Sequence, residues 1–200
     1  SGASVDLPES PMGLREPFPR LLEAVAAVPG TARVRFTSGH PSGCTDELAR
    51  VMAAAPAICP HLHLPLQSGS DRILFLMKRG YSRAAYIGAL KRMQAAIPSL
   101  VLSTDVIVGF PSETEADFEQ TRTMLNEHNF DNAFVFQFSP RPGTRAAEMA
   151  DDVAASDKLR RTHILLEDQD RRSRVFGESF IGREVEVLVE GPSRRDGSRW

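Results

Sequence analysis

Hydrophobic residues along the chain follow two spacings, one typical of helices and one typical of strands. Apolar residues three or four positions apart share a helical face, whereas alternation with polar residues or a short apolar run is typical of a strand. Helices are predicted over residues 17–28, from Thr45 past Met52, from Ser68 to Met77, from Ser82 to Ile97 and from Thr114 to Leu125. Thr45 and Ser82 are predicted to cap their helices, and the pairs Ser68–Asp71 and Thr114–Asp117 have the spacing of a capping box. Strands are predicted over 33–37, 61–66, 100–108 and 132–138. This alternation favours a parallel sheet covered by helices, in an open or a barrel form.

The run over 100–108 is almost continuously apolar and rich in β-branched residues, which predicts a strand buried on both faces. Asp105 interrupts this run with a carboxylate. A buried carboxylate without hydrogen-bond donors is costly, so Asp105 should have donors nearby. Ligand hydroxyls are one candidate, and backbone N–H groups or an arginine are the other.

The pattern changes near Ala150. Residues 156–179 are polar and charged with scattered apolar positions, and we interpret them as a long surface helix or helical linker. Residues 182–190 alternate strictly, which predicts a half-buried strand. A lone strand is not stable, so this one either pairs with the main domain or begins a domain that the chain does not complete.

Composition and charge exclude several classes of protein. Of the 200 residues, 42% are hydrophobic and 25% are charged, which is ordinary for a soluble globular domain. The formal net charge of −2 excludes an overall basic field for nucleic acid, although not a local patch. No apolar run approaches the roughly 18 residues of a membrane helix, and the first ten residues lack the basic and apolar stretches of a signal peptide, so no membrane partner is expected. The two cysteines, Cys44 and Cys59, exclude a disulfide framework and a four-cysteine metal site made by this chain alone.

Candidate chemistry lies in the loops after the predicted strands, because ligand sites of β/α folds gather at the carboxyl ends of the strands. These loops combine glycine or proline with hydrogen-bonding side chains and cover residues 37–41, 67–71, 109–114 and 139–144. Each is interpretable as a turn with helix caps, but their place on one rim favours a pocket for a polar ligand. Gln67 either binds a ligand or caps its strand. Arg79 either complements a helix dipole or forms a fork for a carboxylate or phosphate.

Other candidate groups have simpler interpretations. His61 and His63 point to one face of their strand, but no third metal ligand is evident nearby, so no metal site is predicted. Cys44 and Cys59 are interpreted as core or neutral positions rather than nucleophiles. Arginine pairs after residue 155 suit RNA phosphates, yet acidic residues there are nearly as numerous, which favours a solvated surface.

Four segments resemble the radical-SAM methylthiotransferases, in the family's order. They are RVRFTSGHPSGCTDEL (33–48), ICPHLHLPLQSGSDRILFLMKRGYSRAAY (58–86), LSTDVIVGFPSETEADFEQT (102–121) and FDNAFVFQFSPRPGTRAAEM (130–149). Within the family, HLHLPLQSGS and MKRGY favour the tRNA-modifying MiaB type, since the ribosomal-protein-modifying branch usually differs at QSGS. The resemblance covers about residues 17–190.

The resemblance implies an α/β fold: the C-terminal portion of a partial (β/α)6 radical-SAM barrel, TIM-like, followed by the start of a small β-barrel TRAM domain. The partial core would occupy residues 1–155, a helical linker 156–180, and the start of the RNA-binding TRAM domain 181–200. The implied reaction adds a methylthio group to C2 of N6-isopentenyladenosine next to the tRNA anticodon. The implied cofactors are S-adenosylmethionine and [4Fe-4S] clusters, one of which reduces S-adenosylmethionine to the 5′-deoxyadenosyl radical.

The resemblance also implies the roles of cofactor-binding residues. Gln67 would contact S-adenosylmethionine, and Arg79 would pair with its methionyl carboxylate, a role that suits a guanidinium fork. Asp105 would accept hydrogen bonds from the ribose hydroxyls, which supplies the donors that its burial demands. Gly109 would belong to the loop along the adenine, and Ser139 to the loop that ends the last barrel strand on the cofactor rim. Catalytic residues are not assigned.

The sequence departs from the family in its cysteines. Family members carry three cysteines in an N-terminal cluster domain and a Cys-x-x-x-Cys-x-x-Cys loop after the first barrel strand, and Cys44 and Cys59 lie at neither place. Residue 1 is Ser and not Met, which fits either a processed chain or a piece of a longer one. Because the family's cysteine segments are missing, the resemblance implies a fragment of a longer cytoplasmic enzyme, inactive alone. The intact enzyme would act on tRNA and take electrons from a flavodoxin or ferredoxin. Alternatives are action on N6-threonylcarbamoyladenosine tRNA or a ribosomal protein, or a non-catalytic remnant that binds S-adenosylmethionine or RNA.

Overall fold

The protein is described by a computed structural model that covers residues 17–37, 39–128, 130–189 and 191–193. Each predicted helix is present, although several bounds differ by a few residues. The elements are α1 (Pro17–Ala26), η1 (Pro41–Gly43), α2 (Asp46–Ala54), β1 (His61–His63), α3 (Asp71–Leu76), α4 (Arg83–Ala96), β2 (Val101–Val108), α5 (Glu115–Glu127), β3 (Asn132–Gln137), η2 (Arg145–Glu148) and α6 (Ala155–Glu178).

The strands form one parallel sheet in the order β1-β2-β3, as the alternation of elements predicts. The predicted strand over 61–66 is shorter than expected because Pro65 has no N–H to donate, and pairing resumes at a bridge between Gln67 and Val106. The predicted strand over 33–37 is reduced to one bridge, between Val34 and Ile58. This segment runs beside the chain that leads into β1.

Side-chain caps fix the starts of most helices. Thr45 and Ser82 each accept a backbone N–H three residues on, as predicted. Thr114 and Asp117 form the predicted capping box at the start of α5. The predicted capping box at α3 is wrong: the hydroxyl that accepts from the Ile73 N–H belongs to Ser70, since the chain is still extended at Ser70 and becomes helical at the next residue.

The two faces of β2 differ in burial, which corrects the prediction of a strand buried on both. One face is fully buried against the helices and consists of Leu102, Thr104, Val106 and Val108. The opposite face carries Asp105 and Ile107, which are half-buried, and Ser103, which is buried. The nearly continuous apolar run over 100–108 therefore forms a strand of which one face is only partly buried.

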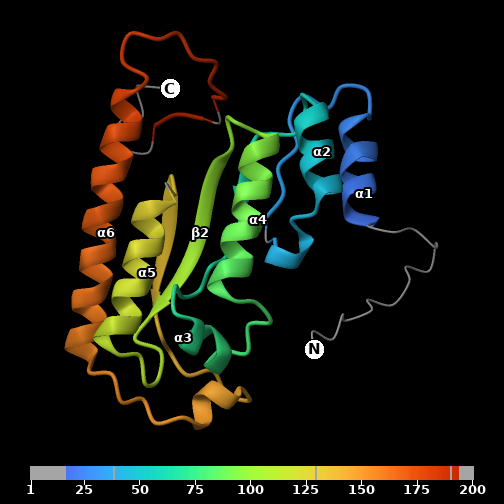
Figure 1. Ribbon diagram of the computed structural model, residues 1–200. Coiled ribbons are helices and arrows are strands. Elements are labelled where there is room, and N and C mark those ends of the chain that lie inside the picture. Colours follow the sequence, from blue (N-terminus) through green and yellow to red (C-terminus); the bar gives the residue numbers. More distant parts are fainter. Residues whose placement is uncertain (1–16, 38, 129, 190, 194–200) are drawn as a thin grey trace.

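The hydrophobic core lies between the sheet and the helices. It is formed by the apolar face of β2, by Tyr86, Leu90 and Met93 of α4, and by Phe118 and Leu125 of α5. Figure 1 shows α4 and α5 on either side of β2, α6 beside α5, and α2 and α1 beyond α4. Helix α6 also packs against β3, so it covers the end of the described sheet.

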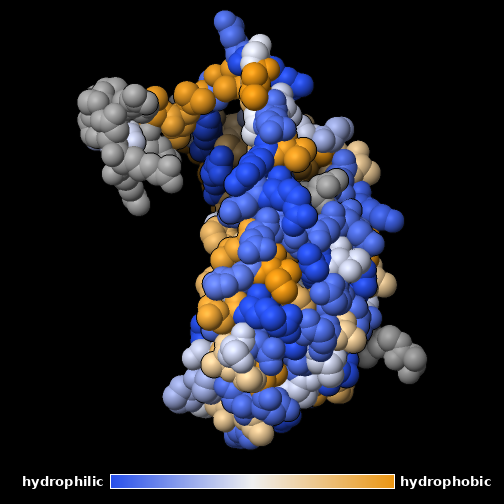
Figure 2. All heavy atoms as spheres, turned by 90° about the vertical axis from the view of Figure 1, so that its left-hand side faces the viewer, coloured by the Kyte–Doolittle hydropathy of each residue, from blue (hydrophilic) through white to orange (hydrophobic). Residues whose placement is uncertain are grey.

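The predicted long helix is confirmed as α6, but the predicted strand over 182–190 is wrong for residues 183–189, which are irregular. A strand needs a neighbour for its backbone hydrogen bonds, and none of the described strands pairs with this segment. Its apolar side chains are consequently exposed, Val187 by 70%, and Figure 2 shows them gathered at the top of the molecule. Within the described residues, no helix has both the length and the apolar character needed to cross a bilayer.

Candidate functional site

A cavity of about 700 Å³ opens at the carboxyl ends of the parallel strands. Gln67, Arg79, Asp105 and Ser139, four residues predicted from sequence to bind a cofactor, all line it. They come from separate places: the chain after β1, the turn after α3, the middle of β2 and the loop after β3. The topology of the sheet therefore gathers residues that are up to 72 positions apart in the sequence, as Gln67 and Ser139 are.

Gln67 holds its place through its backbone. Its N–H donates to the Asp105 carbonyl at 2.8 Å, and its carbonyl accepts from the Ile107 N–H at 2.9 Å. Its φ of 68° lies in the left-handed region, which is uncommon for a residue with a side chain and is found at functional sites. No described residue hydrogen-bonds its side-chain amide, which leaves both ends of that amide for a ligand.

Arg79 lines the cavity, and its guanidinium has one donor without a partner among the described residues. Its Nε is buried and has no hydrogen-bond partner among the described residues. A buried donor of this kind is costly to leave unpaired. An anionic oxygen in the cavity would satisfy it, and a carboxylate matches the geometry of the guanidinium fork.

Asp105 is less buried than the sequence indicates, with 27% of its side-chain surface exposed. Its donor within the chain is His63, whose Nε2 lies 3.3 Å from Asp105 Oδ2. Among the described residues, neither a backbone N–H nor an arginine donates to the Asp105 side chain, and His63 was not among the predicted donors. The carboxylate lines the cavity and is able to accept further hydrogen bonds.

Gly109 does not line the cavity, and the structure gives it another role. Its φ is +71°, and a Cβ there would collide with the side chain of Lys158 on α6. Its N–H donates to Glu113 Oε2 at 2.6 Å, inside the same loop. Glycine at this position therefore lets α6 approach the loop, while the neighbouring Ile107 and Phe110 form part of the cavity wall.

The loop that contains Gly109 is anchored to α6 by a buried ion pair. Arg161 Nη1 donates to Glu113 Oε2 at 2.7 Å, and 5% and 0% of the two side-chain surfaces are exposed. Burial raises the pKa of Glu113, while the Gly109 N–H and Arg161 oppose that rise. Glu113 Oε1 and Arg161 Nε have no partner among the described residues, so each group is only partly satisfied.

The mouth of the cavity is basic. Lys78, Arg79, Arg141 and Arg145 line it, against one acidic residue, Asp105. Arg141 and Arg145 are exposed and form no ion pair with a described residue, whereas most arginines on the helices do. The unpaired positive charge at the mouth favours an anionic ligand.

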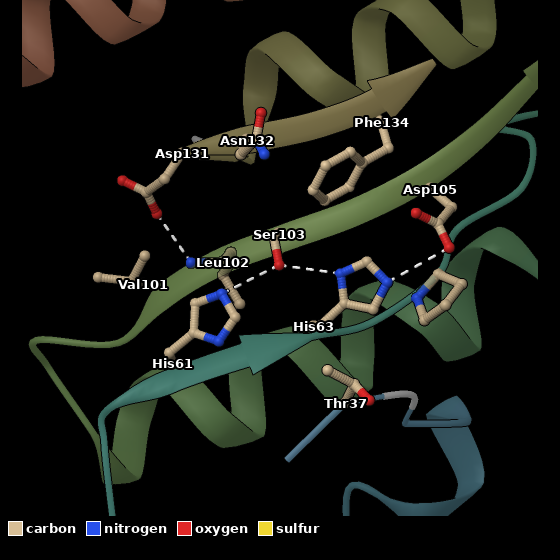
Figure 3. Close-up of a pocket in the computed structure, with 11 residues that line it drawn as sticks. Thr37, His61, His63, Val101, Leu102, Ser103, Asp105, Asp131, Asn132 and Phe134 are labelled. Carbon is tan, nitrogen blue, oxygen red and sulfur yellow. Dashed lines mark hydrogen bonds and ion pairs between the residues drawn. The ribbon is translucent and has the colours of Figure 1, made fainter. Parts of the chain in front are cut away.

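A second cavity, of about 510 Å³, lies next to the first, on the side of the sheet that carries Ser103 and Asp105. Figure 3 shows His61, Ser103 and His63 in a row that ends at Asp105. Asp105 lines both cavities and so stands between them. Within the described ranges, no group of three histidine, cysteine or acidic side chains is arranged to hold a metal ion. His61 and His63 face one side of the sheet, as predicted, and both hydrogen-bond the hydroxyl of Ser103.

Sequence reasoning missed the aromatic wall of the first cavity. Phe110 and Phe138 meet edge to face at 5.2 Å, and Phe136 lies beside them. The signal was present, because Phe134, Phe136 and Phe138 alternate along β3 and its end and therefore point to one side. Phe134 and Phe136 are about half exposed, so none of the described helices covers this side of β3.

Comparison with known proteins defines the class first. The sequence model of the Radical SAM superfamily matches residues 13–125, and the chain belongs to that superfamily. The fold agrees: coproporphyrinogen III oxidase from Escherichia coli, described as a radical SAM enzyme, superimposes with a TM-score of 0.59 at 16% identity, over 82% of this chain and 38% of that one.

More similar relatives carry one particular name. The tRNA-2-methylthio-N(6)-dimethylallyladenosine synthase of Methylacidiphilum infernorum is 45% identical over 186 residues, 93% of this chain and 40% of the relative. The synthase of the same name from Nocardia farcinica is 46% identical over 196 residues, 98% of this chain and 39% of the relative. The chain thus spans about 40% of the length of these curated relatives.

Proposed function

We propose that the chain is the cofactor-binding part of a tRNA-2-methylthio-N6-dimethylallyladenosine synthase. The observation that carries this proposal is the identity of 45–46% over at least 93% of the chain to enzymes of that name. The reaction would add a methylthio group to C2 of N6-isopentenyladenosine next to the anticodon. The substrate would therefore be tRNA, and the enzyme would act in the cytoplasm. A flavodoxin or ferredoxin would supply the electrons.

The first cavity fits S-adenosylmethionine. The unpaired Nε of Arg79 suits the methionyl carboxylate, and the exposed oxygen of Asp105 suits the ribose hydroxyls. The free amide of Gln67 and the hydroxyl of Ser139 offer further polar contacts, and the aromatic wall suits the adenine. When bound beside a reduced [4Fe-4S] cluster, S-adenosylmethionine supplies the radical that starts the reaction. The residues of this chain would bind and orient it.

Cluster binding requires ligands that these 200 residues do not provide. A [4Fe-4S] cluster is held by cysteine thiolates, and the sequence contains two cysteines. Cys44 is also buried, which raises its pKa to about 11 and disfavours the thiolate that a metal needs. We therefore expect the 200-residue chain alone to bind the nucleoside part of the cofactor without cleaving it.

The basic mouth of the cavity supports RNA as the substrate. S-adenosylmethionine has one carboxylate, which Arg79 would satisfy, so Arg141 and Arg145 remain for an anionic substrate. Arg145 begins η2 and Arg141 lies four residues before it in the loop after β3; both are exposed and line the first cavity. RNA phosphates fit this charge, and a basic entrance would hold the RNA backbone beside an extruded adenosine.

We also propose the division of the chain that the sequence predicts. The core extends to residue 155, a helical linker covers 156–180, and the first part of a TRAM domain covers 181–200.

The test of the proposed function is mass spectrometry of tRNA. Deleting the gene that encodes this chain should abolish 2-methylthio-N6-isopentenyladenosine in digested tRNA and leave N6-isopentenyladenosine in its place. Loss of methylthiolated threonylcarbamoyladenosine instead would assign a different substrate. Unchanged tRNA would overturn the proposal. The matched chemical test reconstitutes clusters on the 200-residue chain and measures cleavage of S-adenosylmethionine, which should be absent.

A further inference from the structure

Hydrogen bonds link four side chains in a row on the open face of β1 and β2. His61 Nε2 lies 3.0 Å from Ser103 Oγ, and the same oxygen lies 2.9 Å from His63 Nδ1. The other ring nitrogen of His63, Nε2, lies 3.3 Å from Asp105 Oδ2. Figure 3 shows the row running along the sheet from His61 to Asp105. Strand register creates it, because His63 pairs with Ser103 between neighbouring parallel strands.

The chemistry of the groups fixes which atom donates at each contact. An ionised carboxylate only accepts, so Nε2 of His63 must carry the hydrogen that points to Asp105. In a neutral imidazole the other nitrogen then accepts, and the proton on Ser103 Oγ points to Nδ1 of His63. Ser103 in turn accepts from His61 Nε2. Every donor has one acceptor, and the row runs in one direction, from His61 to Asp105.

The contact with Asp105 also survives protonation of His63. A charged imidazole donates from both nitrogens, so Nδ1 would donate to Ser103 and the hydroxyl would turn toward His61. His61 is then the acceptor, and burial lowers its pKa, which keeps it neutral and able to accept. In both states Nε2 of His63 donates to the carboxylate. Rotation of the Ser103 hydroxyl therefore reverses the direction of the hydrogen bonds between the two histidines, while the hydrogen bond from His63 to Asp105 is kept.

The surroundings hold His63 in this orientation. The side chain of His63 is 14% exposed, and the ring of Phe134 lies edge to face against it with centroids 6.0 Å apart. The charged and titratable groups close to the row are Arg35 and Asp131, beside His61. Asp105 has no other hydrogen-bond donor among the described side chains. Its orientation therefore depends on one imidazole.

We propose that His63 is a positioning residue for Asp105, held by Ser103 and His61, and that it sets the preference of the cavity for ligands with ribose hydroxyls. This inference rests on the proposed function, because it concerns the carboxylate assigned to the cofactor ribose. One oxygen of Asp105 is held by His63, and this contact fixes the rotation of a carboxylate that lines both cavities. Without that contact the carboxylate is free to rotate, and its hydrogen bonds to the ribose lose their fixed geometry.

Two substitutions of His63 separate positioning from mere packing. In His63→Gln, the amide nitrogen is placed near the lost Nε2 and is able to donate to Asp105. In His63→Asn, the shorter side chain reaches Ser103 but not Asp105. His163→Asn, at an exposed position on α6, is the control for the loss of a histidine. Ligand-observed NMR with the full chain would measure affinity for S-adenosylhomocysteine and for its 2′,3′-dideoxy analogue.

The expected result is a loss of discrimination and not a general loss of binding. His63→Asn should lower the ratio of the two affinities about tenfold, the effect of one hydrogen bond to a charged group. His63→Gln should restore most of that ratio, and His163→Asn should not change it. An unchanged ratio in His63→Asn, or an equal loss in the asparagine and glutamine variants, would overturn the proposal.

A measurement without ligand separates this proposal from the proposed function. Long-range ¹H–¹⁵N NMR of the imidazole at pH 8.5 reports which nitrogen of His63 carries the hydrogen. Nε2–H is expected, and Asp105→Ala should shift the population toward Nδ1–H. A predominant Nδ1–H form in the wild type would overturn the row of hydrogen bonds. If the wild type bound neither nucleoside, the cofactor site would be wrong, and the NMR result alone would decide whether His63 holds Asp105.

Discussion

The two faces of β2 differ in burial and in what they contact, although their residues alternate along one strand. Toward the helices the strand presents Leu102, Val106 and Val108, all at most 1% exposed, and Thr104, whose hydroxyl is fully used. Toward the cavities it presents Ser103 and Asp105. The first face contributes to the hydrophobic core, and the second carries the groups assigned to the proposed chemistry. A charged group such as that of Asp105 is thus expected on the cavity side of β2 and not on the helix-facing side.

The largest expected effect comes from moving the carboxylate by one position. Val106→Asp would place an unpaired charge in the core, where it should lower the free energy of unfolding by at least about 4 kcal/mol. Urea denaturation followed by circular dichroism would measure this. Asp105→Val, the reverse exchange on the other face, should leave a folded chain. A stable Val106→Asp variant would show that the helix-facing side is not a tight core.

The next effect concerns the one polar residue on the helix-facing side. Thr104 Oγ1 accepts from the Leu66 N–H at 2.9 Å and donates to the Leu64 carbonyl at 2.8 Å. Thr104→Val keeps the shape but leaves the buried Leu66 N–H without its acceptor, and should destabilise the fold by about 2 kcal/mol. Thr104→Ser is the matched control and should be milder. Equal stabilities of the valine variant and the wild type would contradict this account.

On the cavity face we expect an effect on binding instead of stability. Asp105→Asn should change the free energy of unfolding by less than about 0.5 kcal/mol, because the group is partly exposed and an amide oxygen still accepts from His63. Its affinity for S-adenosylhomocysteine should fall about tenfold, since charge-assisted hydrogen bonds are lost. Thermal denaturation and ligand-observed NMR measure the two quantities. A strong loss of stability with unchanged affinity would reverse the assignment of the two faces.

The smallest expected effect is a dependence of stability on pH from the cavity face. Burial, followed by Arg35 and His63, lowers the pKa of His61 below its usual 6.5. The unfolded chain then binds this proton more readily than the folded one, so the contribution of His61 to stability is complete above pH 6.5 and decreases as the pH falls below it. His61→Gln should flatten this part of the curve. Urea titrations between pH 5 and pH 8 would measure it, and an identical slope in wild type and variant would contradict it.

The sequence was sufficient where a feature depends on local period or local capping. Helical spacing located the helices, and Thr45, Ser82 and the pair Thr114–Asp117 were correctly predicted as caps. The choice between Ser68 and Ser70 depends on where the backbone leaves the extended region, which residue types alone do not determine. The predicted strand over 182–190 fails for a related reason. Its alternation indicates what the segment is suited to, but pairing requires a neighbour that the described residues lack.

For the site, residue types were predictable and distances were not. Gln67, Arg79, Asp105 and Ser139 were predicted individually, and they line one cavity because parallel strands end at one edge. Gly109 was placed in the cofactor loop, yet its neighbour is Lys158, a contact across 49 positions. The donor to Asp105 also escaped prediction, because it depends on the register of β1 against β2.

The contacts of α6 with the loop over 109–114 predict which mutations would abolish function. Lys158 fills the space above Gly109, and Arg161 holds Glu113, although neither side chain lines the first cavity. A random-mutagenesis screen for loss of the modification should therefore recover changes at these two helical positions together with changes at the cavity. Suppressors should then arise within the loop itself, as substitutions that restore its conformation without the helix. Mutations that abolish function would then include positions on α6, although α6 contributes no lining residue to the first cavity.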